Sequence, residues 1–560
     1  MFLNKQTFKI DSKLITFLQQ SMTHWKTTLT SNSKRIADIS IKCGIYQGDA
    51  LSPLLFCIAL NPLSTLIDNS GYNYKLMGDI KISHLFYMDD IKLYARSERD
   101  IDSLIHLTRV FSSDIGMAFG LEKCGRLIIK KGKPVLTQGV TFPNGHIDDI
   151  EAGYKYLGIL QSDGNHDAEV RKNAITQYKK RMRQLLKSQL NGANRIKAIN
   201  AYAVPVIRYT AAIVSWRKED LKATDISTRK MLTMYKSFHP KSNVDRIYTR
   251  REDGGRGLHG IEHTVRAEEQ SMKEYVRMKA LTDPLMARCQ EFMASWDALE
   301  DKDAWYDKPL HGAWHRRVSQ VADMRLSYQW LNKCDIRSNT EALILAAQEQ
   351  ALNTRYIARM IYHTTTDSRC RMCLQHDETI AHLTSGCSKL AGTSYMERHN
   401  NVASIVYKAI CSTYNLELPT DWKAEPHKVV ENQRAKLLWD FHIQTDRMVQ
   451  YNQPDIVLVD KNAKTGIIID VAVPMDGNIR DKELEKIDKY QQLKEELQTL
   501  WKIKMSVVPV VVGSLGAVTE RFPGWLSLIP GKINGISLQK AALLGTARIL
   551  RRVLKLPGLW

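Results

Sequence analysis

Two adjacent carboxylates, Asp89 and Asp90, stand between apolar and aromatic runs in LFYMDDIKLYA, residues 85–95. Runs of this length around a polar pair predict two strands of a hairpin with the acids at its turn. One explanation is a solvated turn, because Asp is a favoured turn residue. The other is a metal site, because carboxylates held this close repel each other unless a cation neutralises them.

Three cysteines and a histidine form a second group in CRMCLQHDETIAHLTSGC, residues 370–387. The spacing of Cys370, Cys373, His382 and Cys387 offers three thiolates and one imidazole to a tetrahedral Zn²⁺. His376 is also near, but His382 fits better, because four residues separate it from Cys387. All four positions would be filled, so we expect a structural zinc whose removal unfolds this small unit.

A third group consists of acids placed against apolar runs. Asp455 lies in PDIVLVD and Asp470 in GIIIDVAVP, two β-rich runs joined by a short turn. A helical run over residues 481–501 follows, and MSVVPVVVG, residues 505–513, predicts a further buried strand. The order of these elements predicts an α/β unit that holds both acids.

Other patterns indicate how these groups are positioned. Residues 1–160 mix short apolar runs with turn signals, which predicts an α+β region where Ser52 caps a helix and Pro53 lies in its first turn. From about 165 to 240 the pattern is helical, with an apolar period close to 3.6 at Ile175, Met182, Leu185 and Leu186. Helical segments then continue to about residue 365. We interpret the tryptophans there as core, with base stacking as the alternative: Trp296, Trp305, Trp314 and Trp330.

Composition limits the class of protein. A chain of 560 residues should form about three or four domains, and a hydrophobic fraction of 44% is ordinary for a globular protein. The formal net charge is +20, and residues 165–260 carry 21 Lys and Arg against 8 Asp and Glu. The positive electrostatic field of so basic a chain favours polyanions such as nucleic acid. Neither a membrane-spanning run nor a signal peptide is evident, so we expect a soluble intracellular protein. The C-terminal helical stretch, residues 537–556, should pack its apolar stripe on a sheet rather than bind a membrane surface.

Four motifs in order carry a resemblance to a known family. They are GIYQGDALSPLLFCIAL at 44–60, YMDD at 87–90, GLEKC at 120–124 and YKYLGI at 154–159. Together they resemble the palm of non-LTR retrotransposon reverse transcriptases. The resemblance implies that Asp89 binds Mg²⁺ or Mn²⁺, that Asp90 has a less direct catalytic role, and that Gln47 and Gly48 line the nucleotide and template site.

The chain departs from this family before Gln47. The family's other metal-binding Asp belongs to an A-F-D motif several tens of residues upstream, and no such motif precedes Gln47 here. Asp11 is far enough upstream, but it precedes a helix-like stretch rather than ending a strand. We therefore expect an N-terminally truncated chain, without the fingers, that has little polymerase activity.

The basic helical stretch falls where the family's thumb would be. Its cations could follow the phosphates of a template–primer duplex, and a solvated helix face is the alternative. The candidates are Lys179, Lys180, Arg181 and Arg183.

The last 165 residues resemble the restriction-like endonuclease of site-specific non-LTR elements. The resemblance implies that Asp455 and Asp470 bind Mg²⁺. Ala472 stands where many such nucleases have Lys, but the retrotransposon form K-x-x-K-Y matches Lys486, Lys489 and Tyr490 on the following helix. Lys486 would be catalytic, with Lys489 and Tyr490 in support. Weaker candidates, from ERHNNV at 397–402, are Arg398 and His399.

These observations predict a multidomain α+β protein. The expected parts are a partial palm (1–160), a helical basic thumb (161–245), a helical linker (246–365), a CCHC zinc knuckle (366–395) and an endonuclease domain (396–560). The resemblance implies an RNA-directed DNA polymerase with a DNA-nicking domain for target-primed reverse transcription. It also implies an RNA template, a DNA target and a nuclear location, with no membrane and no small-molecule cofactor, and it leaves the oligomeric state open. The alternative is a non-catalytic nucleic-acid-binding remnant.

Overall fold

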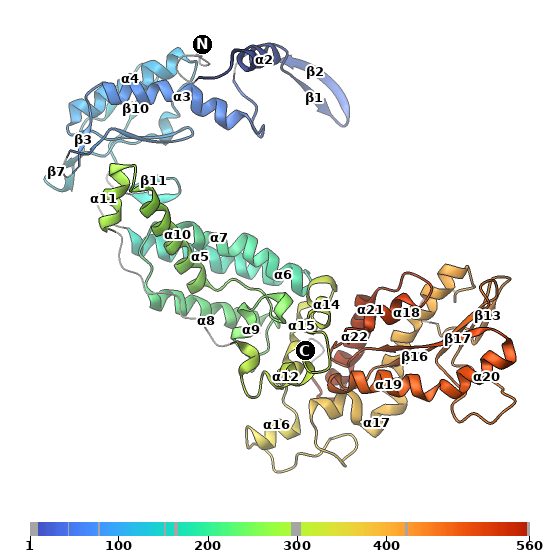
Figure 1. Ribbon diagram of the computed structural model, residues 1–560. Helices are drawn as coiled ribbons and strands as arrows, with labels where there is room; N and C mark the ends of the chain where they lie inside the picture. Colours follow the sequence, from blue (N-terminus) through green and yellow to red (C-terminus); the bar gives the residue numbers. More distant parts are fainter. Residues whose placement is uncertain are drawn as a thin grey trace. The chain divides into compact units, whose positions relative to one another are not determined.

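The computed structural model of this protein describes residues 9–42, 44–76, 79–150, 153–161, 166–292, 304–419 and 424–556. The chain divides into two compact units, both of which mix helices and strands (Figure 1). The first comprises Met1–Val170 with Lys273–Ala294, and the second comprises Arg171–Met272 with Ser295–Trp560.

The first unit combines helices with short antiparallel hairpins. Its helices are α2 (Ser12–Thr23), α3 (Ser52–Asn69), α4 (Glu98–Asp114), the 3₁₀ turn η1 (Leu121–Lys123) and α11 (Pro284–Phe292). Its strands pair as β1 (Lys26–Ser31) with β2 (Lys34–Ser40), β3 (Tyr74–Lys75) with β4 (Lys81–Ile82), β5 (His84–Tyr87) with β6 (Asp90–Leu93), β7 (Ile129–Lys130) with β8 (Lys133–Pro134), β9 (Val140–Phe142) with β10 (Gly145–Ile147), and β11 (Tyr154–Tyr156) with β12 (Ile159–Gln161). Leu63, Ile67 and Leu104 are fully buried where α3 and α4 pack together.

The start of α3 differs in one detail from the sequence prediction. Pro53 lies in the first turn, as expected, but Ser52 is the first helical residue and does not cap the helix. The N-cap residue is Leu51, and no side chain caps the helix. The nearby carboxylate of Asp49 accepts from the amide of Leu51 and the hydroxyl of Ser52, each at 3.2 Å, and its charge favours the positive end of the helix dipole.

The second unit begins with a helical region, which the segment Lys273–Ala294 of the first unit interrupts in sequence. Its helices are α5 (Asp167–Lys187), α6 (Gly192–Ala198), the π-turn η2 (Ile199–Ala203), α7 (Val204–Ala211), α8 (Lys218–Met234), α9 (Asp245–Tyr248), η3 (Arg251–Asp253), α10 (Ile261–Lys279), η4 (Trp305–Asp307), α12 (Ala313–Val318), α13 (Met324–Ser327), α14 (Gln329–Lys333), α15 (Ser338–Gln348) and α16 (Arg355–Met360). The predicted basic helix is thus confirmed as α5, which buries Tyr178, Met182 and Leu186 along one stripe.

The tryptophans of this region form part of a large core. Trp305, Trp314 and Trp330 are buried, which confirms their interpretation as core residues, whereas Trp296 lies outside the described residues. The same core includes α15 and Cys370, Cys373 and Cys387. The cysteine segment is therefore packed into a shared core and does not stand apart.

A five-stranded sheet organises the C-terminal part of the second unit (Figure 1). Its order is β13 (Val429–Glu431), β14 (Ala435–Trp439), β15 (Ile456–Asp460), β16 (Thr465–Ala472) and β17 (Lys504–Val511). All neighbours are antiparallel except β16 and β17, which are parallel and joined by α19 (Ile479–Lys489) and α20 (Gln491–Trp501). The predicted strands are thus confirmed. The remaining elements are η5 (His382–Gly386), α17 (Ser388–Leu390), η6 (Ala391–Tyr395), α18 (Met396–Tyr414), η7 (Asp476–Asn478), α21 (Phe522–Ser527) and α22 (Gly535–Val553).

The two faces of the sheet follow the alternation of side chains along a strand. One face packs Ile467, Ile469 and Val471 against α18 and α22, and the other packs Ile468 against α20. Leu538 and Ala542 of α22 lie in the first of these cores, which confirms that the C-terminal helix packs on the sheet. Among the described residues, none of the helices is long and apolar enough to cross a membrane.

The helical run after β16 is two helices, not one. α19 ends at Lys489 and α20 begins at Gln491, so the break lies at Tyr490. The Tyr490 side chain is fully buried against the sheet, and its backbone leaves helical geometry to place it there. Helical propensity could not reveal this break, because tertiary packing causes it.

Candidate metal sites and nucleic-acid surface

The paired carboxylates of the first unit lie at the tip of an exposed hairpin. The predicted hairpin is confirmed: Tyr87 pairs with Asp90 across a turn formed by Met88 and Asp89. Met88 adopts a left-handed conformation with a φ of 53°. Both carboxylates are exposed, so solvent and ligands can reach them.

The other motifs of the first unit surround this hairpin. The thiol of Cys57 on α3 contacts the sulfur of Met88 at 3.8 Å, so the helix after Gln47 and Gly48 lies against the turn. Gln47 and Gly48 are exposed in their own turn, where Gly48 has a φ of 89°. This is a left-handed conformation that favours glycine.

The YKYLGI segment also lies beside the hairpin. Lys92 of β6 donates to the side chain of Gln161 on β12, and its Nζ lies 5.4 Å from the ring centre of Tyr156. Burial raises the pKa of the Tyr154 and Tyr156 hydroxyls, and the negative charge of Asp90 contributes. Parts of three motifs therefore lie beside the hairpin of Asp89 and Asp90, and the fourth, GLEKC, accepts a hydrogen bond from the Tyr154 hydroxyl at the Lys123 carbonyl.

Two acids alone do not make a complete metal site. Across the described residues, Asp89 and Asp90 are not part of any group of three potential ligands close enough to share one ion. Asp11 accepts from the amide of Lys13 at 2.7 Å and caps α2, in agreement with its predicted place before a helix.

The four basic candidates on α5 do not share one face. Lys180 and Arg183 are exposed and three residues apart, with Lys179 half-buried beside them. Arg181 is on another side, where its guanidinium donates to the carbonyl of Tyr202 at 2.8 Å and stacks 4.4 Å from that ring. Exposed lysines extend the first stripe in both directions, a regularity that spacing along the helix could have revealed: Lys172 and Lys187.

The Cys₃His residues form a compact cluster. The ligand atoms of Cys370, Cys373, His382 and Cys387 all lie within 4.8 Å of one another. Cys370 Sγ is 3.9 Å from Cys387 Sγ, and Cys373 Sγ is 3.4 Å from His382 Nε2. The structure groups His382, and not His376, with the three cysteines. The donor set of three thiolates and one imidazole fits a structural Zn²⁺.

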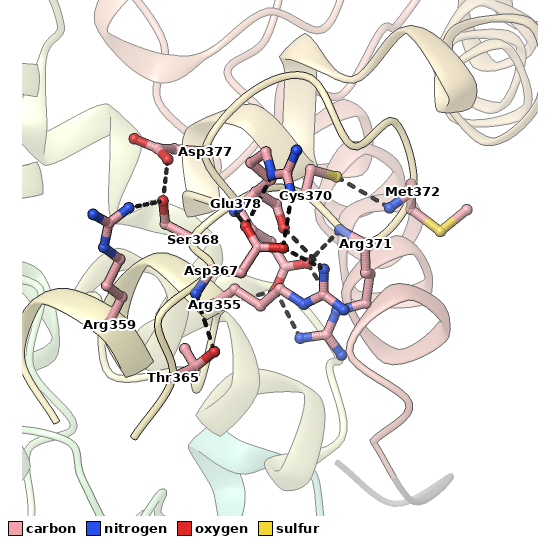
Figure 2. Close-up of polar contacts among 11 residues, drawn as sticks. Arg355, Arg359, Thr365, Asp367, Ser368, Cys370, Arg371, Met372, Asp377 and Glu378 are labelled. Carbon is pink, nitrogen blue, oxygen red and sulfur yellow. Dashed lines mark hydrogen bonds and ion pairs between the residues drawn. The ribbon is translucent and has the colours of Figure 1, made fainter. Parts of the chain in front are cut away.

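Ion pairs brace the loop that carries the first two cysteines (Figure 2). Glu378 is fully buried and accepts from the guanidinium of Arg371 at 2.7 and 2.8 Å and from the amides of Arg371 and Arg355 at 2.9 Å each. Burial alone would raise the pKa of Glu378, but these bonds outweigh it and lower that pKa. The loop is therefore held in place from outside the cluster as well.

Asp455 and Asp470 lie side by side on two interior strands of the five-stranded sheet, where β15 begins. Ile456 pairs with Ile469, so the next residues in the antiparallel register, Asp455 and Asp470, face each other. The Asp455 carboxylate accepts from the amide of Val471 at 2.6 Å. The carboxylate of Asp470 is almost completely buried, whereas that of Asp455 is about one-fifth exposed. Carboxylate oxygens are the donors that Mg²⁺ and Mn²⁺ prefer, so the pair fits such an ion.

Each acid of this pair has a cationic neighbour. Lys486 of α19 places its Nζ 2.5 Å from Asp470, and His399 of α18 places Nε2 3.0 Å from Asp455. Burial alone would lower the pKa of His399, but the bond to Asp455 outweighs it and raises that pKa to about 9. Burial and the charge of Asp455 raise the pKa of Asp470. Burial alone would raise the pKa of Asp455 too, but the bond from His399 outweighs it and lowers that pKa. The pKa values of the two acids are therefore shifted in opposite directions.

The remaining candidates differ in whether they lie near the acids. Lys489 donates to the Tyr490 hydroxyl at 2.9 Å, and the charge of nearby Asp470 adds to burial in raising the pKa of Tyr490. Arg398 is buried away from the acids, where it donates to the carbonyl of Val473 at 3.1 Å. Of the two weaker candidates, the structure brings only His399 to the acids.

Sequence reasoning gave no role to Tyr395. Its hydroxyl contacts three backbone groups of the Cys₃His segment. A tyrosine eight residues after the last cysteine has no local signal in the sequence, because the contacts depend on the path of the chain around the cluster.

Comparison with known proteins agrees with the motifs. Residues 3–160 match the family described as reverse transcriptase (RNA-dependent DNA polymerase). The chain is 23% identical over 433 residues to a retrovirus-related Pol polyprotein from the type-1 retrotransposable element R2 of Popillia japonica, covering 72% of this chain and 68% of the relative. It is 22% identical over 445 residues to the corresponding R2 polyprotein of Nasonia vitripennis, covering 73% of this chain and 42% of the relative.

A third relative extends the same similarity. It is a retrovirus-related Pol polyprotein from the type-2 element R2DM of Drosophila melanogaster, 21% identical over 486 residues, which cover 80% of this chain and 42% of the relative. The chain thus spans about two-fifths of the length of two of these polyproteins and about two-thirds of the other. Residues 3–160 of this protein thus form a reverse-transcriptase domain, and most of the chain is homologous to the Pol polyproteins of R2 non-LTR retrotransposons.

Proposed function

We propose that this chain nicks DNA with Asp455, Asp470 and Lys486 in support of target-primed reverse transcription. The observation that carries the proposal is the Asp455–Asp470 pair on the neighbouring strands β15 and β16, with Lys486 2.5 Å from the second acid. A DNA target would also imply a nuclear location.

The chemistry divides among these residues. Asp455 and Asp470 would hold Mg²⁺ or Mn²⁺, which stabilises charge on the scissile phosphate and activates water when bound. Lys486 supplies a positive charge that would move from Asp470 to the phosphate or attacking water once the acid binds the ion. Lys489 and Tyr490 support this end of α19, since the hydroxyl of Tyr490 fixes the Lys489 ammonium.

A plasmid-nicking assay tests the proposal. Supercoiled DNA incubated with the purified chain and Mg²⁺ or Mn²⁺ is expected to become a nicked circle, and EDTA should prevent this. A plasmid that stays supercoiled under both metals would contradict the proposal.

The first unit is proposed to bind RNA template and primer, but to polymerise poorly in this polypeptide. Nucleotidyl transfer uses two divalent ions that need bridging acids, and Asp89 and Asp90 lack a third acid within reach in the described structure. In primer extension with Mg²⁺ or Mn²⁺ we expect no cDNA above background, and Asp89→Asn should change nothing. Robust cDNA synthesis that Asp89→Asn abolishes would show that the site is complete.

The stripe on α5 is proposed to contact phosphates. Replacing Lys180 and Arg183 together by Ala should make log K fall less steeply with log salt, by about 1.8 for duplex DNA if each contacts one phosphate. Fluorescence anisotropy over a salt series measures this slope. The matched control replaces two exposed lysines of α8, Lys222 and Lys230, and should leave the slope unchanged. Equal slopes for the two double variants would remove α5 from the interface.

One observation favours a second function, binding of nucleic acid without catalysis. Each of the two acids has a cationic neighbour from the chain itself, His399 or Lys486, that compensates its charge. A protein that binds RNA or DNA in a salt-sensitive way, yet nicks no plasmid and extends no primer, would be such a binding remnant.

A further inference from the structure

A single tyrosine hydroxyl connects the Cys₃His cluster to the helix that carries His399. The Tyr395 hydroxyl lies 3.0 and 2.9 Å from the carbonyl oxygens of His382 and Leu383, and it accepts from the amide of Cys387 at 3.1 Å. Two of these backbone groups belong to cluster residues. The position of this hydroxyl therefore depends on the shape that the segment takes when its four side chains converge.

The same tyrosine is joined to the first turn of α18. It ends η6, and α18 begins at the next residue. The guanidinium of Arg398, three residues later, lies 5.2 Å from the Tyr395 ring centre. Arg398 is only 2% exposed and donates to the Thr546 hydroxyl at 2.9 Å and to the Val473 carbonyl at 3.1 Å. This turn is thus fixed to the sheet and to the cluster at once.

His399 follows directly and faces the acids. Its Nε2 is 3.0 Å from Asp455 Oδ2 and 3.1 Å from the Val471 carbonyl oxygen. A tyrosine and a residue four positions later lie on the same side of a helix, so a shift at Tyr395 moves His399 with it. A bond of this length tolerates only small displacements.

We propose that Tyr395 is a positioning residue that anchors the start of α18 on the Cys₃His cluster and thereby holds His399 against Asp455. The cluster has four ligands and no open position, so it supports nicking from outside the catalytic site. The proposal rests on the nicking function proposed above. It makes the orientation of His399 at the acids depend on the Cys₃His cluster.

The test compares two tyrosine-to-phenylalanine variants of the full chain. Tyr395→Phe removes the bridging hydroxyl and keeps the ring beside Arg398. Tyr414→Phe is the matched control, because it removes a hydroxyl at the other end of α18 that donates to Asp460 at 2.8 Å. Zinc per chain, DNA affinity, single-turnover nicking, and hydrogen exchange of the amides of residues 396–402 are measured for both.

Tyr395→Phe is expected to retain one zinc and wild-type DNA affinity, while its nicking rate falls by about tenfold to a hundredfold, as misplacement remote from the chemistry can cause. Exchange in residues 396–402 should accelerate, and chelation of zinc from the wild-type protein should accelerate it in the same residues. Tyr414→Phe should leave all four readouts unchanged.

Wild-type nicking and exchange in Tyr395→Phe would overturn the proposal, and so would loss of zinc, because the hydroxyl would then only support the cluster. If the wild-type chain does not nick at all, the nuclease proposal fails, and the exchange of residues 396–402 in the two variants still decides whether Tyr395 anchors α18.

Discussion

Asp455→Asn is expected to abolish metal-dependent nicking while DNA binding remains. The substitution keeps the shape of the side chain and its bond from the Val471 amide, but it removes the charge that faces His399 and would face the metal. Loss of several kcal/mol of charge stabilisation corresponds to a rate decrease of about a thousandfold or more. Conversion of supercoiled plasmid to nicked circle at saturating protein measures the rate.

The control for this prediction lies on the same strand. Asp460, at the other end of β15, accepts from Tyr414 and from the amides of Asn462 and Ala463 in the turn. Asp460→Asn should therefore nick at close to the wild-type rate. Equal loss in both variants would indicate damage to the sheet, and wild-type nicking by Asp455→Asn would place the chemistry elsewhere.

Removal of zinc is expected to destabilise the second unit strongly. Binding free energies of roughly 10–16 kcal/mol in small zinc domains rival the whole stability of a domain, about 5–15 kcal/mol. Cys370 and Cys387 lie in the core that the cluster shares with α15 and α22, so the effect should not stay local. We expect Cys387→Ala to lose zinc and to lower the thermal midpoint by roughly 10 °C or more.

The affinity of the cluster for zinc should decrease as the pH falls. Burial raises the pKa of Cys387 to about 11, and the thiol must release its proton to bind zinc. Zinc affinity is therefore expected to increase with pH throughout the neutral range, which competition with a chelator at several pH values measures.

Cys411→Ala is the matched control for Cys387→Ala. Cys411 is equally buried, but it lies on α18 outside the cluster. Its loss should leave a small cavity that costs about 1 kcal/mol and retain zinc. A midpoint for Cys387→Ala no lower than that of Cys411→Ala would show that the cluster contributes little stability.

The features predicted well from sequence depend on local chemistry. Four ligands with knuckle spacing can meet around one ion whatever surrounds them, and the structure brings Cys370, Cys373, His382 and Cys387 together. The hairpin at Asp89 and the strands that carry Asp455 and Asp470 follow from short apolar runs with turn signals between them. Their pairing register is what places the two acids opposite each other.

The features that sequence missed depend on contacts between distant residues. The break at Tyr490 follows from burial of that ring against the sheet, in a run with strong helical propensity. The contact of Arg181 with Tyr202 and that of Asp49 with the start of α3 depend on packing and on a turn that propensity does not specify. His399 is a weaker candidate from its motif, but its contact with Asp455 spans 56 residues of sequence, a separation at which no spacing rule applies.

One reaction tests the central claim, that this polypeptide nicks DNA but does not synthesise cDNA. Supercoiled plasmid, RNA, Mg²⁺ and labelled deoxynucleotides are incubated with the full chain, and the products are separated by size. The predicted result is nicked circles whose 3′ ends carry no label. Intact plasmid together with labelled cDNA made on an added primer would contradict it.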